Sequence, residues 1–236
     1  MIEGDLRERY QEVTSMSANE TLTLYDYWRS SACYRVRIAL NLKGLRYASR
    51  PIHLVRNGGE QHSAAYHDVN PQEAVPALVD GERVIRQSLA IIEYLDESYH
   101  GQMKLLPATA RDRARDRGLA MLVACDIHPL NNLRVMQFLE HEWGTSLDQR
   151  ERWTRHWIEA GFHAFEALLA DHPSTGAYCG GDAPTLADIC LIPQVYSANR
   201  FGVDMAPFPT IGRINEHCLA LPAFDAARPE QQADAT

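Results

Sequence analysis

The spacing of hydrophobic and polar positions changes near residue 100. Before it, Thr21–Trp28 (TLTLYDYW) alternates with the two-residue period of a strand, and residues 32–43 follow with the helical period up to Gly44. Ser88 begins a second helical pattern, SLAIIEYLDESY. β-rich runs between the two helices predict three more strands, over residues 47–54, 75–79 and 83–85. The order β-α-β, an irregular link, then β-β-α predicts an α/β unit.

Long helical patterns replace this alternation in the second half of the chain. They cover residues 111–142, with an interruption at Pro129, then residues 148–170 and 185–201. The last of them is preceded by a capping box, Thr185-Leu-Ala-Asp, in which side chain and backbone satisfy each other's hydrogen bonds at a helix start. The second half is therefore predicted to be helical throughout.

The two periods predict two domains. We expect an α/β domain over residues 21–103 and an all-helical domain over residues 110–228. Residues 1–20 are expected to form a flexible N-terminal extension. The tail after Pro222 is rich in Ala, Gln and Asp and is expected to fray.

Composition and charge narrow the function classes. The 236 residues are 45% hydrophobic and 23% charged, which is ordinary for a soluble protein. The net charge of −8 argues against nucleic acid as a partner, because phosphate binding requires a basic face. The five scattered cysteines show no metal-ligand spacing, the N-terminus lacks a signal-peptide core, and no apolar run is long enough to span a membrane. These features favour a cytoplasmic protein without a metal site.

The stretch Arg29-Ser-Ser-Ala-Cys33 lies where the first strand ends and the first helix begins. Unpaired N–H groups and the positive end of the helix dipole meet there, so a thiolate at this point is stabilised. That thiolate belongs either to Cys33 or to a bound molecule. In the alternative interpretation, Ser30 or Ser31 only caps the helix and Cys33 is packing.

Two more short motifs have both a structural and a functional interpretation. Pro76 either simply opens a strand or forms a cis peptide bond that turns the backbone of Val75 toward a peptide-like ligand. Gln87 and Ser88 either cap a helix or use its N-terminus to bind a carboxylate.

The polar residues around Pro129 are the third such case. They form either a solvated face or a pocket wall, and the same choice applies to Arg200 near the end of the last helical pattern. The residues concerned are His128, Asn131, Asn132 and Arg134.

The order of these motifs resembles the zeta class of glutathione transferases, most closely its bacterial maleylacetoacetate isomerases. The matching strings are RSSACYRVRIALNLKG, HLVRNGGEQHS, NPQEAVPALVDG, QSLAIIEYLDE, CDIHPLNNLRV and APTLADICLIPQVYSANRFGVD. The resemblance implies a thioredoxin-like N-terminal domain, an all-α C-terminal domain, a homodimer and glutathione as cofactor.

The resemblance also assigns roles to residues. Ser30, Ser31 and the backbone of residues 32–35 would line the glutathione thiol, Gln61 would reach the glycine end, and Val75 would pair with the cysteinyl backbone. Gln87 and Ser88 would hold the γ-glutamyl carboxylate. The full implied cofactor site is Ser30, Ser31, Ala32, Cys33, Gln61, Val75, Pro76, Gln87, Ser88, His128, Asn132, Leu133 and Arg134.

One departure from the family pattern concerns the cysteine. The eukaryotic pattern has cysteine directly after the paired serines, whereas Ala32 stands there in this chain and Cys33 comes one residue later. One residue turns a helical side chain by about 100°, so Cys33 does not inherit the position. The nucleophilic sulfur is therefore expected to come from glutathione.

The implied activity is the cis–trans isomerisation of maleylacetoacetate to fumarylacetoacetate in aromatic amino-acid catabolism. Thiolate addition makes the cis double bond single, rotation follows, and elimination gives the trans product. Ser30, Ser31 and Arg29 are the expected catalytic residues, and the small anionic cis-enone acid would be bound by Arg29, Arg134 and Arg200.

Three alternatives remain open. The substrate is alternatively maleylpyruvate, a smaller analogue. The spacing of Ser30 and Cys33 also echoes a thiol reductase that has lost its first cysteine. A non-catalytic glutathione-binding stress protein is the third alternative.

Overall fold

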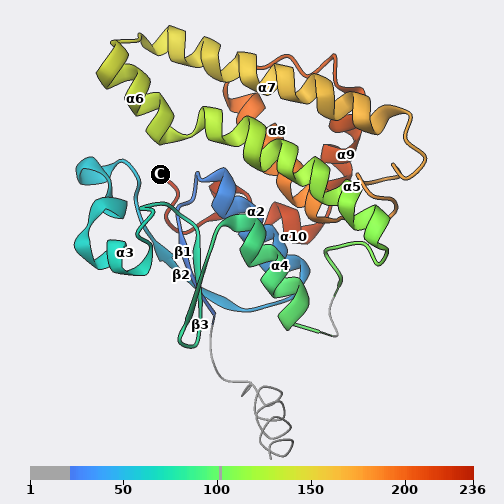
Figure 1. Ribbon diagram of the computed structural model, residues 1–236, viewed down its shortest axis with the longest axis horizontal. Helices are drawn as coiled ribbons and strands as arrows, with labels where there is room; N and C mark the ends of the chain where they lie inside the picture. The colour runs from blue at the N-terminus through green and yellow to red at the C-terminus, as the bar shows by residue number, and fades with distance from the viewer. Residues whose placement is uncertain (1–21, 101–102) are drawn as a thin grey trace, which may run out of the picture.

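The computed structural model describes residues 22–100 and 103–236. A four-stranded sheet in the order β2-β1-β3-β4 forms the first part of the chain (Figure 1). Its central strand β1 (Leu22–Asp26) alternates buried and half-buried side chains, as its sequence predicts. β2 (Tyr47–Pro51) runs parallel to β1, whereas β3 (Ala77–Asp80) and β4 (Arg83–Arg86) form antiparallel pairs.

Two helices connect the sheet to the rest of the molecule. α2 (Ser31–Leu42) packs against α4 (Ser88–Ser98) and against the helical half. The chain leaves α2 at Gly44, which adopts a φ of 61°, a left-handed conformation that glycine allows without strain. The link between β2 and β3 contains the short helix α3 (Ala64–Val69), capped by Ser63, and two 3₁₀ turns, Arg56–Gly58 and Glu60–His62.

The helical half has its longest helix, α7, along its outer side (Figure 1). Within the described residues its only β pairing is an isolated bridge between Tyr178 and Gly181. The helices are α5 (Ala110–Met121), α6 (Leu133–Trp143), α7 (Leu147–Ala170), α8 (Leu186–Arg200), α9 (Pro209–Leu219) and α10 (Pro222–Asp225). A π-helical segment (Leu122–Ile127) and 3₁₀ turns at His128–Asn131 and Pro229–Gln231 complete it.

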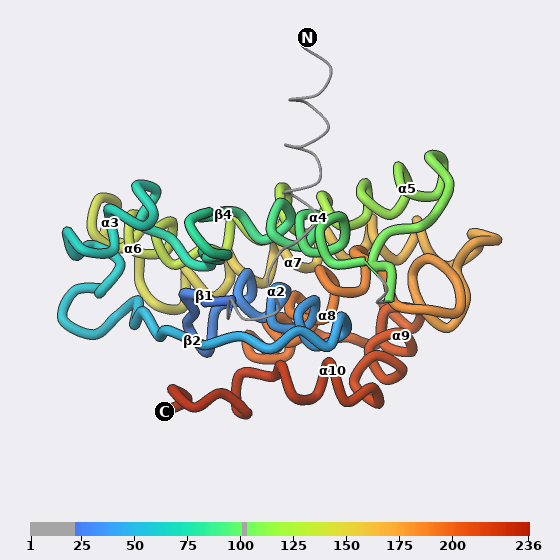
Figure 2. Tube along the Cα trace, turned by 90° about the horizontal axis from the view of Figure 1, so that it is seen from below, coloured from blue at the N-terminus to red at the C-terminus, as the bar shows by residue number. Residues whose placement is uncertain are grey.

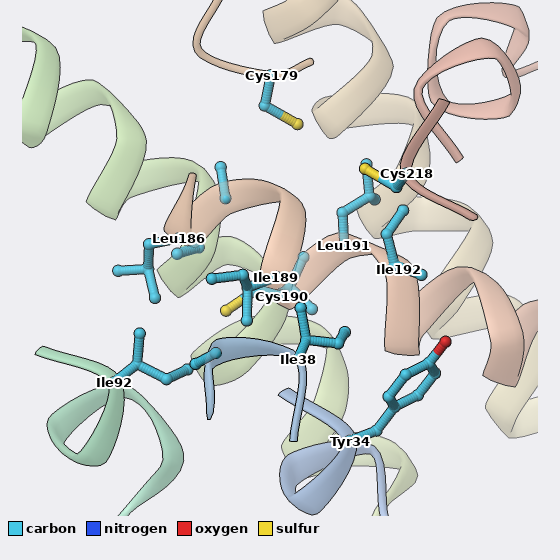
Figure 3. Packing of buried hydrophobic residues seen from close by; sticks show 14 of the residues in the cluster. Tyr34, Ile38, Ile92, Cys179, Leu186, Ile189, Cys190, Leu191, Ile192 and Cys218 are labelled. Carbon is cyan, nitrogen blue, oxygen red and sulfur yellow. The ribbon is translucent and has the colours of Figure 1, made fainter. Parts of the chain in front are cut away.

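One continuous apolar core joins the two halves. Tyr34 and Ile38 of α2, Ile92 of α4 and Ile189 and Cys190 of α8 belong to one buried cluster, in which Ile38 lies close to Ile189 and Cys190 (Figure 3). All five side chains are buried. Since burying each such side chain stabilises the fold by about 1.5–3 kcal/mol, α2 is held firmly between the sheet and the helices. Side chains that α2 and α8 present to a binding site are therefore held on a rigid support.

The architecture confirms the predicted fold class, an α/β thioredoxin-like part followed by helices. The predicted strands and helices are present with ends shifted by a few residues, and the Thr185 capping box is present. The helical pattern over residues 111–142 with an interruption at Pro129 is confirmed in α5 and α6, but the interruption is longer than predicted, because the chain forms the π-helical segment and a 3₁₀ turn between them. Helices α3, α9 and α10 were not predicted.

The predicted domain boundaries, between residues 103 and 110, stay a prediction. The expected flexible extension over residues 1–20 lies outside the described residues. Among the residues that the structure does describe, no helix combines the length and the apolar character that a membrane span requires.

The C-terminal tail does not fray, so that expectation is wrong. The tail runs back beneath α2 and the sheet (Figure 2). Arg37 Nε donates to the carbonyl of Ala227 at 3.0 Å, and Asn41 Nδ2 donates to that of Ala223 at 3.0 Å. The backbone N–H of Trp28 donates to Asp234 Oδ2 at 3.1 Å. Polar side chains of α2 thus give the tail the partners that its own composition lacks.

Candidate active site

A cavity of about 720 Å³ lies where the start of α2, the start of α4, the β2–β3 link and the helical half meet. Of the fifteen residues predicted for the site, only Cys33 does not line it. Those that do are Arg29, Ser30, Ser31, Ala32, Gln61, Val75, Pro76, Gln87, Ser88, His128, Asn132, Leu133, Arg134 and Arg200. Residues far apart in the sequence therefore share one cavity.

The start of α2 presents two hydroxyl groups to the cavity. Ser30 is the N-cap, and its Oγ accepts a hydrogen bond from the backbone N–H of Cys33 at 3.3 Å. This cap uses a lone pair of Ser30, so its hydroxyl proton is still able to donate. Ser31 is the first helical residue, and its hydroxyl makes no hydrogen bond with any part of the chain that the structure describes. Both hydroxyls are available to an anionic sulfur.

Cys33 faces the interior instead. Its side chain is fully buried in a small cluster with Tyr27, Tyr66 and Val75. Burial, reinforced by the charge of Asp26, raises the pKa of the Cys33 thiol well above its usual value, so the thiol stays protonated. The side chain of Cys33 is therefore not a nucleophile of this cavity, whereas the role of its backbone beside the glutathione thiol stays a prediction.

The opposite wall holds the second pair of motifs. The Val75–Pro76 peptide bond is cis, which is the less common of the two alternatives. Gln87 adopts a φ of 72° ahead of α4, and its amide donates to Gln72 Oε1 at 2.7 Å. Ser88 is the first residue of α4 and is buried at the cavity wall. A second helix N-terminus therefore faces the same cavity as the first.

Several buried polar atoms in the cavity wall have no hydrogen-bond partner among the described residues. They belong to Arg35 (Nε and Nη2), Gln61 (Oε1), Asn131 (Oδ1 and Nδ2) and Gln194 (Nε2). Buried polar groups are almost always paired, so this concentration in one cavity indicates a polar ligand. Sequence reasoning missed Arg35, Gln194 and also Cys125, since each lies in a helix and carries no local signal.

The helical half contributes a neutral imidazole and two guanidinium groups. Burial, then the charges of Arg35 and Arg134, lower the pKa of His128 to about 3, so His128 is neutral at pH 7. Partial burial and then the charge of Arg29 lower the pKa of Arg200. Arg29 and Arg200 are thus close enough to repel each other, and an anion between them relieves that repulsion. The pocket-wall alternative therefore holds for the residues around Pro129 and for Arg200.

Comparison with known proteins agrees with this geometry. The family model for the glutathione S-transferase N-terminal domain matches residues 24–103. A probable maleylacetoacetate isomerase of Vibrio cholerae is 51% identical over 91% of this chain and 99% of its own length. The chain belongs to the glutathione transferase family, in its zeta class.

Two solved relatives have the same fold. The holo structure of a maleyl pyruvate isomerase, a bacterial zeta-class glutathione S-transferase, has a TM-score of 0.88 and 47% identity, covering 91% of this chain and 100% of that one. A maleylacetoacetate isomerase from Methylobacterium extorquens, solved with bound malonate and glutathione, has a TM-score of 0.87 and 43% identity, covering 91% and 99%.

Proposed function

We propose that this zeta-class transferase is a glutathione-dependent cis–trans isomerase that converts maleylacetoacetate to fumarylacetoacetate. We further propose that it acts as a cytoplasmic homodimer in aromatic amino-acid catabolism. The observation that carries the proposal is one cavity in which two serine hydroxyls at a helix start, both with a proton free to donate, lie beside a pair of arginines. That arrangement combines a site for an anionic sulfur with a site for a carboxylate.

The cavity fits glutathione as the cofactor. Glutathione carries two carboxylates, two amides, an amine and a thiol, and the wall offers the hydroxyls of Ser30, Ser31 and Ser88 together with two helix N-termini. We place the thiol at Ser30 and Ser31, the γ-glutamyl carboxylate at Gln87 and Ser88, and the glycine end toward Gln61. The Methylobacterium extorquens relative, with glutathione and malonate bound together, supports this choice of cofactor.

When bound, glutathione supplies a thiolate that adds reversibly to the cis double bond of the substrate. The chain's part is to keep that sulfur ionised and correctly placed. Ser31 donates a hydrogen bond from an otherwise unpaired hydroxyl, and the first N–H groups of α2 add the positive end of its dipole. A hydrogen bond to a charged partner contributes about 1.5–3 kcal/mol. Because one pKa unit corresponds to about 1.4 kcal/mol, one or two such bonds bring a thiol pKa near 7.

The arginines hold the substrate. Arg29 directly precedes the two serines. Arg134 is the second residue of α6, and Arg200 is the last residue of α8. Their guanidinium groups match the planar fork of a carboxylate. Arg29 is also placed to stabilise negative charge that develops on the substrate carbonyl, since it lines the cavity and directly precedes the two serines that hold the sulfur. His128, being neutral, contributes a hydrogen bond and leaves the charge to the arginines.

Maleylpyruvate is the second candidate substrate, because a relative of 47% identity is a maleyl pyruvate isomerase. Both substrates are cis-enone acids, so the same chemistry serves either. The proposal is tested by measuring isomerisation of both compounds with and without glutathione. We expect turnover of both only with glutathione, and a higher kcat/KM for maleylacetoacetate.

Appreciable turnover without glutathione would contradict the mechanism. A higher kcat/KM for maleylpyruvate would reassign the substrate. Tight binding of glutathione with no turnover of either acid would instead support the non-catalytic alternative. Light scattering of the purified protein tests the homodimer.

A further inference from the structure

Two arginines on α2, two residues apart, are buried to the same degree. Arg35 is 2% exposed and Arg37 is 0% exposed. Arg37 has a full set of partners: Asp26 Oδ1 at 2.7 Å and the carbonyls of Trp28 and Ala227 at 2.9 and 3.0 Å. A buried guanidinium normally has such partners, because an uncompensated charge in the interior costs several kcal/mol.

Arg35 lacks them. It makes one hydrogen bond, from Nη1 to Ser88 Oγ at 3.2 Å, and its Nε and Nη2 atoms have no partner within residues 22–100 and 103–236. The ionisable groups that act most on its charge are the thiols of Cys190, Cys125 and Cys33, none of which is a carboxylate. Arg35 is therefore a buried cation at the cavity wall without a counter-ion from the described chain.

The single bond to Ser88 has a direction. A guanidinium only donates, so Ser88 Oγ is the acceptor and the hydroxyl proton of Ser88 is free for another partner. Ser88 is the first residue of α4, where unpaired N–H groups already favour an anion. A positive charge directly behind this hydroxyl makes it a stronger donor toward an anion in the cavity.

We propose that Arg35 is a positioning residue of the cofactor site: it orients Ser88 as a donor and supplies the charge that selects a carboxylate at the γ-glutamyl end of glutathione. The inference rests on the proposed function, which puts that carboxylate at Ser88. The unpaired guanidinium atoms are closed off from the cavity surface, so Arg35 acts through Ser88 and through the field of its charge. The missing counter-ion arrives with the ligand.

The test compares two ligands on three proteins by calorimetry. The ligands are glutathione and 4-aminobutyryl-cysteinyl-glycine, which keeps the amine and thiol but lacks the α-carboxylate of the γ-glutamyl residue. The proteins are the wild type, Arg35→Met and Arg35→Lys. In Arg35→Met we expect glutathione to bind about tenfold more weakly, with less than about twofold change for the decarboxylated ligand. Arg35→Lys keeps the charge, so it should keep most of the preference for glutathione over the decarboxylated ligand.

Equal weakening of both ligands in Arg35→Met would show a merely structural role and overturn the inference, as would an unchanged preference. If Arg35→Met does not fold, Arg35→Gln replaces it in the same comparison, because glutamine is neutral but still able to donate to Ser88. Arg35→Gln should also lose the preference for glutathione over the decarboxylated ligand. Ser88→Ala is the matched partner variant: Arg35→Met should add little to its loss of preference. Failure of the wild type to bind glutathione would overturn the proposed function instead.

Discussion

Ser30 and Ser31 are adjacent at the start of α2 but have different structural roles. Ser30 caps the helix through Cys33 N–H, whereas the hydroxyl of Ser31 has no partner in the described structure. A cap contributes about 1 kcal/mol to stability, and a free hydroxyl at the same place contributes nothing to it. The two serines are therefore separable by experiment, one acting on the fold and the sulfur, the other on the sulfur alone.

We expect Ser31→Ala to lower kcat/KM for the isomerisation by about tenfold to a hundredfold, because it removes one hydrogen bond to a charged sulfur. Its melting temperature should match that of the wild type, whereas Ser30→Ala should melt lower because it loses the cap. Cys33→Ser is the control and should keep most of its activity. A loss of a hundredfold or more in Cys33→Ser, or none in Ser31→Ala, would contradict this division of roles.

Which site residues the sequence predicts depends on whether they carry a local signal. The serine pair and Gln87–Ser88 stand at helix starts, which a change of period and a capping residue reveal. Arg35 and Gln194 sit inside helices, where a polar residue usually faces water, and only tertiary packing turns them inward. Cys33 misleads for the opposite reason, since a cysteine near a helix start looks reactive until its burial is known.

At the scale of elements, α8 is the helix that brings Gln194 and Arg200 to the cavity, and two buried carboxylates fix its start. Asp188 accepts from the N–H of Thr185 at 2.8 Å and from that of Cys179 at 2.9 Å. Asp116 of α5 accepts from the Thr185 hydroxyl. The second oxygen of Asp116 has no hydrogen-bond partner in the described part of the chain. A charge on Asp116 is thus only partly satisfied.

This predicts a pH dependence of stability. Burial, reinforced by the charge of Asp188, raises the pKa of Asp116 to about 7, although its hydrogen bond from Thr185 opposes the shift. Because the folded pKa exceeds the unfolded value of 3.8, the folded state binds more protons between them. The stability that Asp116 contributes is complete below pH 3.8 and is lost as the pH rises through about 7, on the order of 4 kcal/mol in all.

Urea unfolding between about pH 4 and about pH 8 measures this slope. We expect Asp116→Asn to flatten it, since an amide does not ionise. Asp112→Asn, an exposed position on the same helix, is the control and should follow the wild type. An Asp116→Asn slope equal to that of the wild type would rule out this carboxyl as the cause.

Elements with clean periodicity were predictable, whereas those fixed by tertiary contacts were not. β1, α4 and α8 follow from period and caps, and the structure bears them out. Between α5 and α6 the sequence predicts only an interruption at Pro129. It does not show that the chain forms a π-helical segment and a 3₁₀ turn there, which bring His128 to the cavity. α9 begins with a proline and contains Gly212, so its propensity is weak, and packing of Ile211, Ile214 and Cys218 holds it.

At the scale of the whole molecule, α2 is packed between the helical half and the C-terminal tail. α8 covers one side of it, and the tail accepts hydrogen bonds from Arg37 and Asn41 on the other. The tail also reaches Trp28, the residue before Arg29 and the serines. The site's first helix start is therefore supported by a segment more than 180 residues away in sequence, which no local pattern shows.

Removal of residues 222–236 tests this support. The deletion exposes the apolar face beneath Phe224 and Ala227, which are fully buried, and takes the Ala227 carbonyl from Arg37. We expect the unfolding free energy to fall by about 3–5 kcal/mol, since a buried Phe alone contributes about 1.5–3 kcal/mol and a lost partner of a buried charge adds to it.

Glutathione binding should weaken as well, because Trp28 loses its bond to Asp234 and the chain before Ser30 is freed. Deletion of residues 235–236 alone is the matched control, and it should change stability by no more than about 0.5 kcal/mol. Urea unfolding and calorimetry with glutathione provide the two readouts. If the protein lacking residues 222–236 unfolds at the same urea concentration as the full chain, the tail does not stabilise α2, and the helical half alone holds this helix.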